Sequence, residues 1–329
     1  MPGVKISVAM CTYNGAEFLP QQLQSIVDQL RPADEIVICD DGSTDKTQAL
    51  LKQFAAESSI PVSLRFNDQN LGTSKNFEQA IRLCTGNVIA LSDQDDVWRS
   101  DKLQFVEESF NGTPKAGLFF SDAEIVDEDL NPFGKTMWEA IDFNAQKRKL
   151  VAISRAHEVL ITGWTVTGAT MAFRSSFVNL ALPIPDGIAM IHDGWIALTI
   201  AAVADVVMIE EPLINYRQHG RQQIGAPAGT KSQPNLSETW GTALRRRNSS
   251  ADLYKILATL GQRLREHSSA YDVREALLFV GDYSSHLNAR ANLPQNRLSR
   301  LPGILRELVT LRYHEYANGF KSAAKDFVS

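Results

Sequence analysis

The chain has 329 residues, of which 44% are hydrophobic and 22% are charged, and its net charge is −5. This ordinary globular composition excludes collagen, low-complexity disorder and a small disulfide scaffold. The three cysteines form no C-x-x-C pair and lie in or beside apolar segments, which is typical of a reducing compartment. The N-terminal apolar stretch is too short for a signal peptide, and no stretch reaches the roughly 18 apolar residues of a membrane span. We therefore expect a soluble, cytoplasmic protein.

The charge is unevenly distributed along the chain. The part from Arg245 onward carries a net charge of +6, and the preceding 244 residues carry −11. An acidic surface repels bare phosphate unless a cation intervenes, so we expect no nucleic-acid partner. The basic end either faces anionic lipid or is simply solvated.

The first 120 residues alternate β-branched segments with helical patterns. Strands are predicted at 4–10, 35–40, 62–67, 87–92 and 116–121. This repetition predicts an α/β fold with a mostly parallel central sheet and helices on both faces. Such sheets bind ligands at the carboxyl ends of their strands.

The pattern becomes mixed from residue 121 to residue 218. Residues 168–175 indicate a strand and a helix start, residues 193–204 an apolar helix that follows His192, and residues 206–220 a further strand. Residues 221–236, rich in Gly, Pro and Ser, are predicted to be a flexible loop or linker. We therefore expect a catalytic domain at 1–220 and a C-terminal helical region at 237–329.

Two apolar stripes mark the late helices. Frequent acids and the lack of a Trp/Phe-rich face favour packing of these stripes over membrane insertion, although a role at the membrane surface stays open. The stripes consist of Leu253, Ile256, Leu257, Leu260 and Leu264, and of Leu301, Ile304, Leu305 and Leu308.

Polar residues follow the first two predicted strands. Thr12, Tyr13 and Asn14 supply a hydroxyl, a ring and an amide that suit a base or a sugar, but the same residues also make an ordinary turn. Asp40 and Asp41 precede good N-cap residues, and two adjacent carboxylates exceed what capping requires. A base-reading acceptor fits one of them.

Three carboxylates follow the fourth predicted strand, at Asp93, Asp95 and Asp96. Their mutual repulsion raises the pKa of each neighbour unless a cation lies between them. Oxygen-only ligands favour Mg²⁺ or Mn²⁺, which bind through one or two carboxylates and are completed by substrate phosphates. The chain has no P-loop, no G-x-G-x-x-G after the first strand, no G-x-S-x-G and no H-E-x-x-H, so we expect a metal to hold the phosphates.

Six segments together carry a family resemblance. In chain order they are VAMCTYNGAEFLPQQLQSI, VICDDGSTDKT, NLGTSKNF, ALSDQDDVW, HDGW and YRQHG. They resemble the inverting family-2 glycosyltransferases of GT-A fold over roughly residues 4 to 220. The C-terminal part, with NRL, LRYHEYANGF and KSAAKD, is similar to bacterial rhamnosyltransferases of cell-surface polysaccharide synthesis.

The resemblance implies a metal-dependent inverting transferase. It implies transfer of L-rhamnose from dTDP-rhamnose, or of a hexose from a UDP-sugar, to a hydroxyl of a glycan or lipid-linked glycan acceptor. O-antigen, capsule or exopolysaccharide synthesis and peripheral association with the inner membrane follow from the same resemblance. The residues alone leave a nucleotidyltransferase and a non-catalytic sugar-binding protein open, and they do not indicate the oligomeric state.

The resemblance also implies roles for individual residues. Asp193 is the general base, with His192 where the family more often has an acidic residue. Asp93 and Asp95 match the ends of the D-x-D motif, whose second carboxylate holds the metal against the diphosphate. From a flap, Arg217 and His219 are expected to reach the diphosphate or the metal, although a solvated loop position for His219 is left open. The nucleotide contacts implied are Thr12, Tyr13, Asn14, Glu17, Asp40 or Asp41, Asn70, Gly72 and Asn76.

Overall fold

A computed structural model describes residues 3–161, 165–220, 222 and 249–328. These residues form two compact units, one within Met1–Arg247 and one within Asn248–Ser329. The predicted linker at 221–236 lies outside the described residues except for Gln222, and each unit is presented by itself below.

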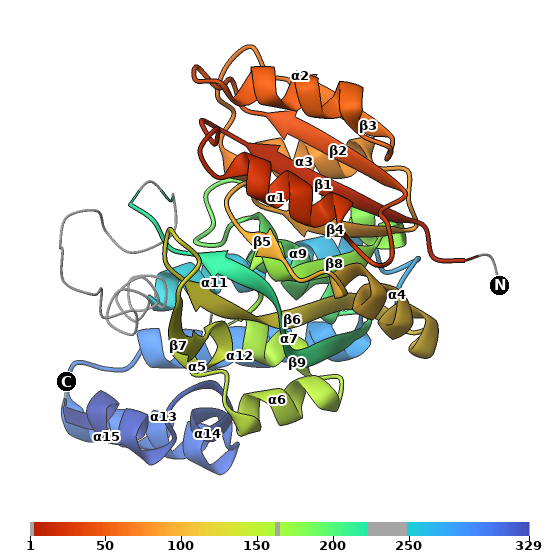
Figure 1. The fold of residues 1–329 in the computed structure, drawn as a ribbon. Helices are drawn as coiled ribbons and strands as arrows, with labels where there is room; N and C mark the ends of the chain where they lie inside the picture. Colours follow the sequence, from red (N-terminus) through yellow and green to blue (C-terminus); the bar gives the residue numbers. More distant parts are fainter. Residues whose placement is uncertain (1–2, 162–164, 221, 223–248, 329) are drawn as a thin grey trace. The chain divides into compact units, whose positions relative to one another are not determined.

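The N-terminal unit is built on a nine-stranded sheet in the order β3-β2-β1-β4-β8-β6-β9-β5, with β7 paired to β6 (Figure 1). β1 to β4, β6 and β9 run in one direction, and β5, β7 and β8 run in the other. The prediction of an α/β fold with a mostly parallel sheet is therefore confirmed. The strands are β1 Ile6–Thr12, β2 Glu35–Asp40, β3 Val62–Phe66, β4 Val88–Ser92, β5 Val97–Trp98, β6 Ala116–Val126, β7 Pro132–Thr136, β8 Met171–Arg174 and β9 Asp205–Arg217.

Helices connect and cover these strands. α3 packs on β1 and β2, and α9, which consists almost entirely of buried residues such as Trp195 and Leu198, packs on β6 and α3. Every residue of β1 and β4 is buried, as expected for parallel strands covered on both faces. The elements are α1 Leu19–Val27, α2 Thr47–Glu57, α3 Thr73–Leu83, α4 Lys102–Gly112, α5 Met137–Ala140, α6 Ala145–Ala152, α7 Ala156–Leu160, the 3-10 turns η1 Gly168–Thr170 and η2 Ser175–Phe177, α8 Val178–Ala181 and α9 His192–Ala201.

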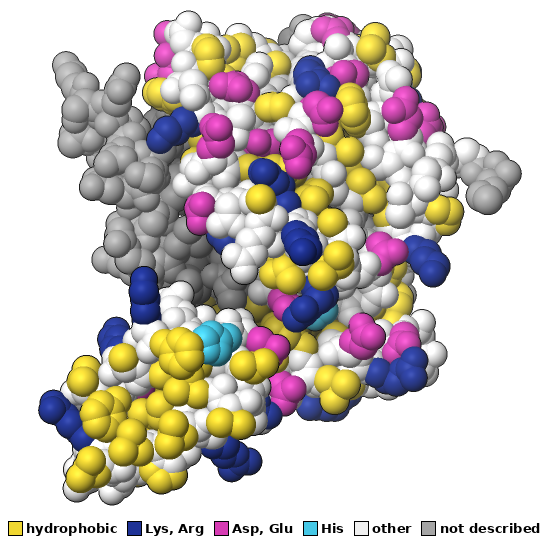
Figure 2. All heavy atoms as spheres, turned by 90° about the horizontal axis from the view of Figure 1, so that it is seen from below, with side chains coloured by type: hydrophobic (Ala, Val, Ile, Leu, Met, Phe, Trp, Pro, Cys, Tyr) yellow, Lys and Arg dark blue, Asp and Glu magenta, His cyan; other side chains and the backbone are white. Residues whose placement is uncertain are grey.

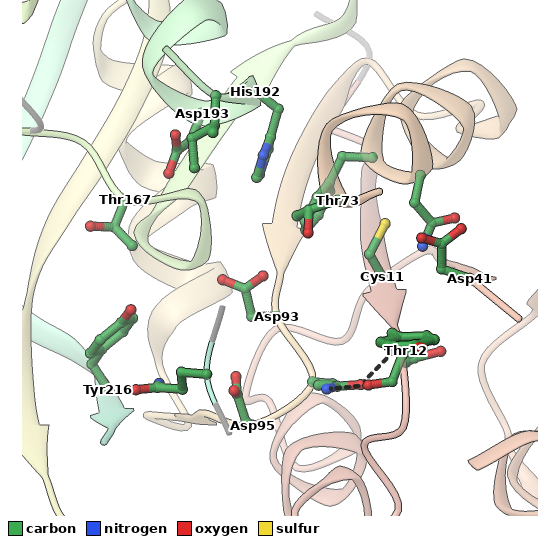
Figure 3. A pocket seen from close by; sticks show the side chains of 16 residues that line it. Cys11, Thr12, Asp41, Thr73, Asp93, Asp95, Thr167, His192, Asp193 and Tyr216 are labelled. Atoms are coloured by element: carbon green, nitrogen blue, oxygen red, sulfur yellow. Dashed lines mark hydrogen bonds between the residues drawn. The ribbon is translucent and has the colours of Figure 1, made fainter. Parts of the chain in front are cut away.

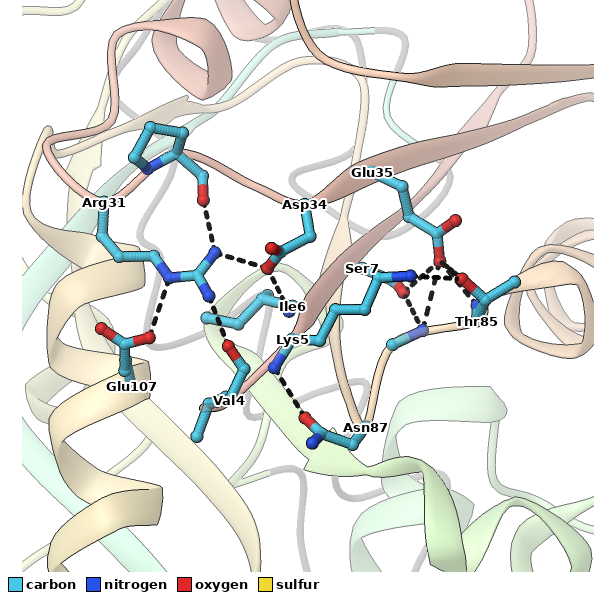
Figure 4. A network of polar contacts seen from close by, with 12 residues as sticks. Val4, Lys5, Ile6, Ser7, Arg31, Asp34, Glu35, Thr85, Asn87 and Glu107 are labelled. Atoms are coloured by element: carbon cyan, nitrogen blue, oxygen red, sulfur yellow. Dashed lines mark hydrogen bonds and ion pairs between the residues drawn. The ribbon is translucent and has the colours of Figure 1, made fainter. Parts of the chain in front are cut away.

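A polar network ties the amino ends of β1 and β2 to their neighbours (Figure 4). The Arg31 guanidinium donates to Asp34 at 2.6 Å and to Glu107 at 3.1 Å, and Asp34 accepts from the Ile6 amide at 2.7 Å. Glu35 accepts from the Ser7 hydroxyl at 2.5 Å, the Thr85 amide at 2.6 Å and the Thr85 hydroxyl at 2.9 Å. These contacts fix the end of the sheet at which the parallel strands begin.

The C-terminal unit is helical, as predicted. The Ser249 hydroxyl accepts from the Asp252 amide at 3.1 Å and caps its first helix, and the Asn296 side chain caps α13 through the Leu298 amide at 2.9 Å. No helix in the described part of the chain is both long enough and apolar enough to cross a bilayer. The helices are α11 Ser250–Glu266, α12 Arg274–Ala291, α13 Arg297–Val309, α14 Arg312–Tyr316 and α15 Phe320–Val328.

The two predicted apolar stripes have different outcomes. All five members of the first stripe, on α11, are buried, so its prediction as a packing face is confirmed. In the second stripe, on α13, Ile304 is buried and Leu308 is half-buried, but Leu301 and Leu305 are exposed. The packing prediction is wrong for these two leucines, because α13 is apolar over a wider arc than its neighbours α14 and α15 cover.

Candidate active site

A pocket opens where β1 and β4 end and α9 begins (Figure 3). It brings together residues that are up to about two hundred positions apart in the chain. Of the residues predicted for the site, Thr12, Tyr13, Asp41, Asn76, Asp93, Asp95 and Asp193 line the pocket, whereas Asn14, Glu17, Asp40, Asn70, Gly72, Arg217 and His219 do not. The remaining lining residues are Cys11, Thr73, Phe77, Gln94, Thr167, Ile191, His192, Tyr216 and Gln222.

The two carboxylates that follow β2 differ in their surroundings. Asp40 accepts from the Thr12 hydroxyl at 2.8 Å, from Ser43 at 2.5 Å and 3.0 Å, and from the Gln48 amide at 2.9 Å. These four bonds occupy both of its oxygens within the protein. Asp40 is therefore placed to order the turn, and only Asp41 borders the pocket.

Asp41 organises the loop that precedes α3. Its oxygens accept from the backbone amides of Leu71 at 2.8 Å and Gly72 at 2.9 Å, and from the Asn67 side chain at 3.0 Å. Gly72 has a φ of 83°, a conformation that glycine adopts without a steric penalty. The Asn70 side chain also accepts from the Gly72 amide, at 3.1 Å. Asn70 and Gly72, which were predicted to line the pocket, therefore shape the loop beside it.

The turn after β1 is held by a side chain of the pocket lining, Gln94, and by residues of the loop after β2. Gln94 forms a two-way bond with the backbone of Tyr13, whose ring is exposed at the mouth, with distances of 2.8 Å and 3.1 Å. Asn14 accepts from the Thr44 amide at 2.8 Å, and its own amide donates to Ser43 at 2.8 Å. Glu17 is exposed. The pocket therefore receives the ring of Tyr13 and the side chain of Thr12, and Asn14 holds the neighbouring turn.

The three acids after β4 occupy different positions. The Asp93 carboxylate lines the pocket and forms no hydrogen bond with the described residues, while the Asp95 carboxylate lies 2.9 Å from Nε2 of His219. Asp96 is buried and accepts from the Arg217 amide at 3.1 Å, and its second oxygen has no partner in the described chain. Burial, together with the negative charges of Asp95 and Asp193, raises the pKa of Asp93 to about 8. Burial and the negative charges of Asp95 and Asp93 raise the pKa of Asp96 well above its usual range.

This concentration of negative charge suits a divalent cation. No group of three or more His, Cys, Asp or Glu side chains in the described residues is arranged to hold a metal by itself. Mg²⁺ and Mn²⁺ at phosphate sites take one or two carboxylates and complete their shell with substrate oxygens and water. The Asp93 carboxylate, which has no hydrogen-bond partner among the described residues, and the Asp95 carboxylate provide that smaller set, so the residues fit a metal shared with a phosphorylated ligand.

Arg217 lies outside the pocket lining. Its guanidinium donates to the Asp95 carbonyl at 2.7 Å, to Gln21 at 2.6 Å and to the Glu128 carbonyl, and it lies 4.6 Å from the centre of the Phe18 ring. With these donors engaged and the side chain buried, Arg217 orders the acidic loop from behind. This position differs from the predicted contact with a diphosphate.

Asp193 stands in the first turn of α9 and faces the pocket. Its Oδ2 accepts from the Gly168 amide at 3.0 Å, and its Oδ1 accepts from the Gly194 amide at 2.6 Å. The backbone therefore fixes the carboxylate on the far side of the pocket from Asp41 (Figure 3). A positioned carboxylate in an enclosed site is suited to general-base chemistry.

His192 lies next to Asp193 and stacks on Phe77, with ring centres 4.2 Å apart and planes at 13°. Burial lowers the pKa of His192, against the opposing charge of Asp193, so the imidazole is neutral near pH 7. Neither ring nitrogen has a hydrogen-bond partner in the described part of the chain. His192 thus contributes an uncharged, flat wall beside the carboxylate.

Sequence reasoning missed Lys102, which is fully buried. Its ammonium donates to the Ala169 carbonyl and lies 4.0 Å from the centre of the Trp98 ring, and burial lowers its pKa to about 7. Ala169 neighbours the Gly168 amide that holds Asp193, so Lys102 supports that turn. The sequence offered one signal for a buried lysine here: its spacing from Leu103, Val106 and Phe110 places it on the buried face of α4.

Comparison with known proteins identifies a family. Residues 7–175, which include β1 to β8 and the acidic loop, match the family described as Glycosyl transferase family 2. An uncharacterized glycosyltransferase of Nostoc sp. is 30% identical over 240 residues, which are 71% of each chain. The dTDP-rhamnosyl transferase RfbG of Shigella flexneri is 26% identical over 233 residues, which are 68% of this chain and 76% of that protein.

Solved structures share the architecture at low sequence identity. A fragment of S. aureus TarS in complex with UDP-GlcNAc aligns with a TM-score of 0.57 and 12% identity, covering 98% of this chain and 91% of that one. The mannosyltransferase PcManGT of Pyrobaculum calidifontis, in complex with GDP-Man and Mn²⁺, aligns with a TM-score of 0.51 and 17% identity, covering 87% and 81%. These likenesses concern the fold.

Proposed function

The chain belongs to glycosyl transferase family 2 and is a glycosyltransferase, and from this premise we propose that it transfers a sugar with inversion, in a metal-dependent reaction, from a nucleotide donor to a glycan hydroxyl. The observation that carries the proposal is the placement of Asp193 and Asp93 on one pocket, with Asp95 beside them. Such a pocket has separate carboxylates for an incoming hydroxyl and for a metal-bound leaving group. Family membership decides against the nucleotidyltransferase and the non-catalytic sugar-binding protein.

The nucleotide occupies the side of the pocket formed by Thr12, Tyr13 and Asp41 in this proposal. The Tyr13 ring, exposed at the mouth, is available to stack on a base, and the Asp41 loop supplies the pocket edge. The diphosphate then lies toward Asp93 and Asp95. These two carboxylates would hold Mg²⁺ or Mn²⁺, with the His219 imidazole beside Asp95. When bound, the metal neutralises the charge of the departing diphosphate.

Asp193 acts as the general base. As the acceptor oxygen forms its bond to the anomeric carbon, its proton passes to the Asp193 carboxylate, and the bond between that carbon and the diphosphate oxygen breaks. Attack from the face opposite the diphosphate inverts the anomeric centre. The backbone amides of Gly168 and Gly194 hold the carboxylate in place before it accepts the proton.

Similarity to RfbG supports dTDP-rhamnose as the donor. The complex of TarS with UDP-GlcNAc supports the alternative, a UDP-sugar. We propose a glycan or lipid-linked glycan acceptor, a role in cell-surface polysaccharide synthesis, and a place in the cytoplasm on the inner face of the membrane. We assign catalysis to residues 1–220, the linker to 221–236 and a helical region to 237–329.

Isothermal calorimetry on the full chain tests the donor. The panel is dTDP-rhamnose, UDP-glucose, UDP-galactose, UDP-N-acetylglucosamine and GDP-mannose, each with Mn²⁺ or Mg²⁺ and again with EDTA. We expect one donor to bind with a metal and to lose at least about tenfold in affinity with EDTA. Preferred binding of dTDP-rhamnose supports the rhamnosyl assignment, whereas preferred binding of another donor overturns it. Equal affinity with and without metal overturns the metal role.

A further inference from the structure

The surface of α13 carries an uncovered apolar stripe. Leu298, Leu301, Leu305 and Val309 are spaced so that, at about 100° per residue, they lie within an arc of about 80°. Leu298 is 72% exposed, Leu305 is 55% exposed and Val309 is 82% exposed. Exposed apolar side chains gathered on one stripe are unfavourable in water, and such a patch commonly marks a surface that binds a partner or a membrane.

α15, which packs against α13, also has an exposed apolar side. Phe320, Ala324 and Val328 fall on one side of this helix, and all three are exposed. Lys321 and Lys325 lie at the edge of that side and are exposed as well. Figure 2 shows hydrophobic side chains gathered over the C-terminal helices with basic side chains around them.

The acids of the two helices are turned inward. Glu307 of α13 is buried and lies 2.8 Å from Nδ1 of His286, and Asp326 of α15 accepts from Arg290 at 2.6 Å and from the Tyr313 hydroxyl at 2.7 Å. The outward charges of α13 and α15 are therefore all positive. They belong to Arg297, Arg306, Lys321 and Lys325, which form no ion pair with any described residue, and to Arg300, which bonds to backbone carbonyls.

We propose that α13 and α15 form a docking surface for an anionic phospholipid bilayer. Apolar side chains flanked by lysine and arginine match the layered chemistry of a membrane interface, with acyl chains beneath and anionic headgroups at the level of the basic groups. An anionic bilayer and the acidic first unit of a second copy both complement the basic groups, but the bilayer also offers a continuous apolar phase beneath its charges for the exposed leucines. The inference rests on the C-terminal unit alone. This inference rests on the proposed function in one respect: the surface would hold the enzyme at the membrane that contains the lipid-linked acceptor.

Vesicle cosedimentation of the full chain tests this surface. The vesicles are phosphatidylcholine alone, or phosphatidylcholine with about one third phosphatidylglycerol, at low and high salt. We expect binding to the anionic vesicles, weakened by salt. The double variant Leu305→Ser/Val309→Ser should lower the partition coefficient at least about tenfold, because a buried leucine contributes that much alone. The variant Arg306→Gln/Lys321→Gln/Lys325→Gln should weaken binding at least as much and reduce the salt dependence, since only Arg297 and Arg300 of the basic groups remain.

Matched controls distinguish binding through this surface from nonspecific binding of the chain to vesicles. Leu30→Ser and Lys115→Gln change exposed residues of the N-terminal unit and should bind like the unmodified chain. Circular dichroism verifies that each variant is folded. Failure of the unmodified chain to bind anionic vesicles, or equal binding by the face variants, overturns the proposal. A dimer in light scattering that Leu305→Ser/Val309→Ser converts to a monomer, without vesicle binding, also overturns it and assigns the face to a second copy.

Donor calorimetry on the same preparations keeps the two proposals apart. Vesicle binding without donor binding would support the surface and contradict the proposed donor chemistry. Donor binding without vesicle binding would contradict the surface alone. The face variants should retain the unmodified donor affinity, because none of the substituted residues belongs to the pocket.

Discussion

The Oδ2 atom of Asp193 accepts a hydrogen bond from the backbone amide of Gly168 at 3.0 Å. Glycine leaves room for this approach, since a Cβ at position 168 would lie 3.1 Å from Nε2 of His192, which is closer than an ordinary contact. This contact joins the first turn of α9 to the turn before β8. It fixes the orientation of the carboxylate before any ligand arrives.

Asp193→Asn should separate chemistry from binding. The amide oxygen of asparagine can still accept from Gly168, although the Gly194 amide loses its acceptor. The fold and the donor affinity should be retained, while the side chain can no longer take a proton. We expect kcat to fall by about 10² to 10⁴. Donor calorimetry and a transfer assay on the same variant measure the two effects. Loss of donor affinity together with activity would contradict the role of Asp193 as base.

Asp95→Ala should remove the response to metal. The unmodified protein should bind its donor at least about tenfold more tightly with Mn²⁺ than with EDTA, whereas the variant should show one weak affinity under both conditions. Asp28→Ala, which changes an exposed aspartate at the end of α1, is the control. If Asp95→Ala kept the full metal response, the metal would have to be assigned to other groups.

Arg217→Met should act on stability more than on ligand contacts. It removes the donors to the Asp95 and Glu128 carbonyls and to Gln21, together with the packing of a buried side chain. Asp95 is the least exposed of these acceptor residues, and a group left without a partner costs about 1 to 3 kcal/mol. We expect the free energy of unfolding in urea to fall by about 2 to 4 kcal/mol.

Arg65→Met, at an exposed position of β3, is the matched control for this loss and should change stability little. Unchanged stability of Arg217→Met with loss of donor binding would return Arg217 to the diphosphate role that the sequence predicts.

Glu35 gives a prediction on pH. Although its partial burial acts to raise the pKa, the bonds from Ser7 and Thr85 and the charge of Lys5 lower the pKa of Glu35 below its usual value of 4.5. A carboxyl with a lowered folded pKa stabilises the fold above its unfolded pKa, and this contribution is lost as the pH falls through the folded pKa. Glu35→Gln should therefore be less stable than the unmodified chain at pH 7, by about 1 kcal/mol.

This difference in unfolding free energy should shrink as the pH falls below 4.5. Urea titrations at several pH values measure it. Glu57→Gln, which alters an exposed residue at the end of α2, serves as the control. A difference that stayed constant down to acidic pH would show that the charge of Glu35 contributes nothing.

The sequence predicted the strands that are buried on both faces, because short continuous apolar segments such as residues 36–39 are typical of strands in a covered parallel sheet. It did not predict β5, since Val97 and Trp98 are too few to show a period and pair with Ile214 and Asn215, far along the chain. Pocket residues such as Asp93 could be predicted from the sequence because they directly follow a buried strand.

The hydrogen-bond partners of the site residues could not be predicted from the sequence. The orientation of Arg217 away from the pocket depends on Gln21 and Glu128, which only the folded chain brings near. The acids Glu307 and Asp326 counted against an exposed apolar face in the sequence, yet tertiary packing turns both toward His286 and Arg290. Charge counts along a helix cannot show which charges remain at its surface.

The anchoring of the acidic loop by β9 sets an order of events during synthesis. Asp96 and its partner, the Arg217 amide, are separated by 121 positions, and β5 has no strand to pair with until β9 has been made. At about 5 to 20 residues per second, a ribosome needs roughly 6 to 24 s to cover that distance. During this interval the nascent chain has its acids but not the strand that anchors them, so a product terminated before β9 lacks the fixed acidic loop.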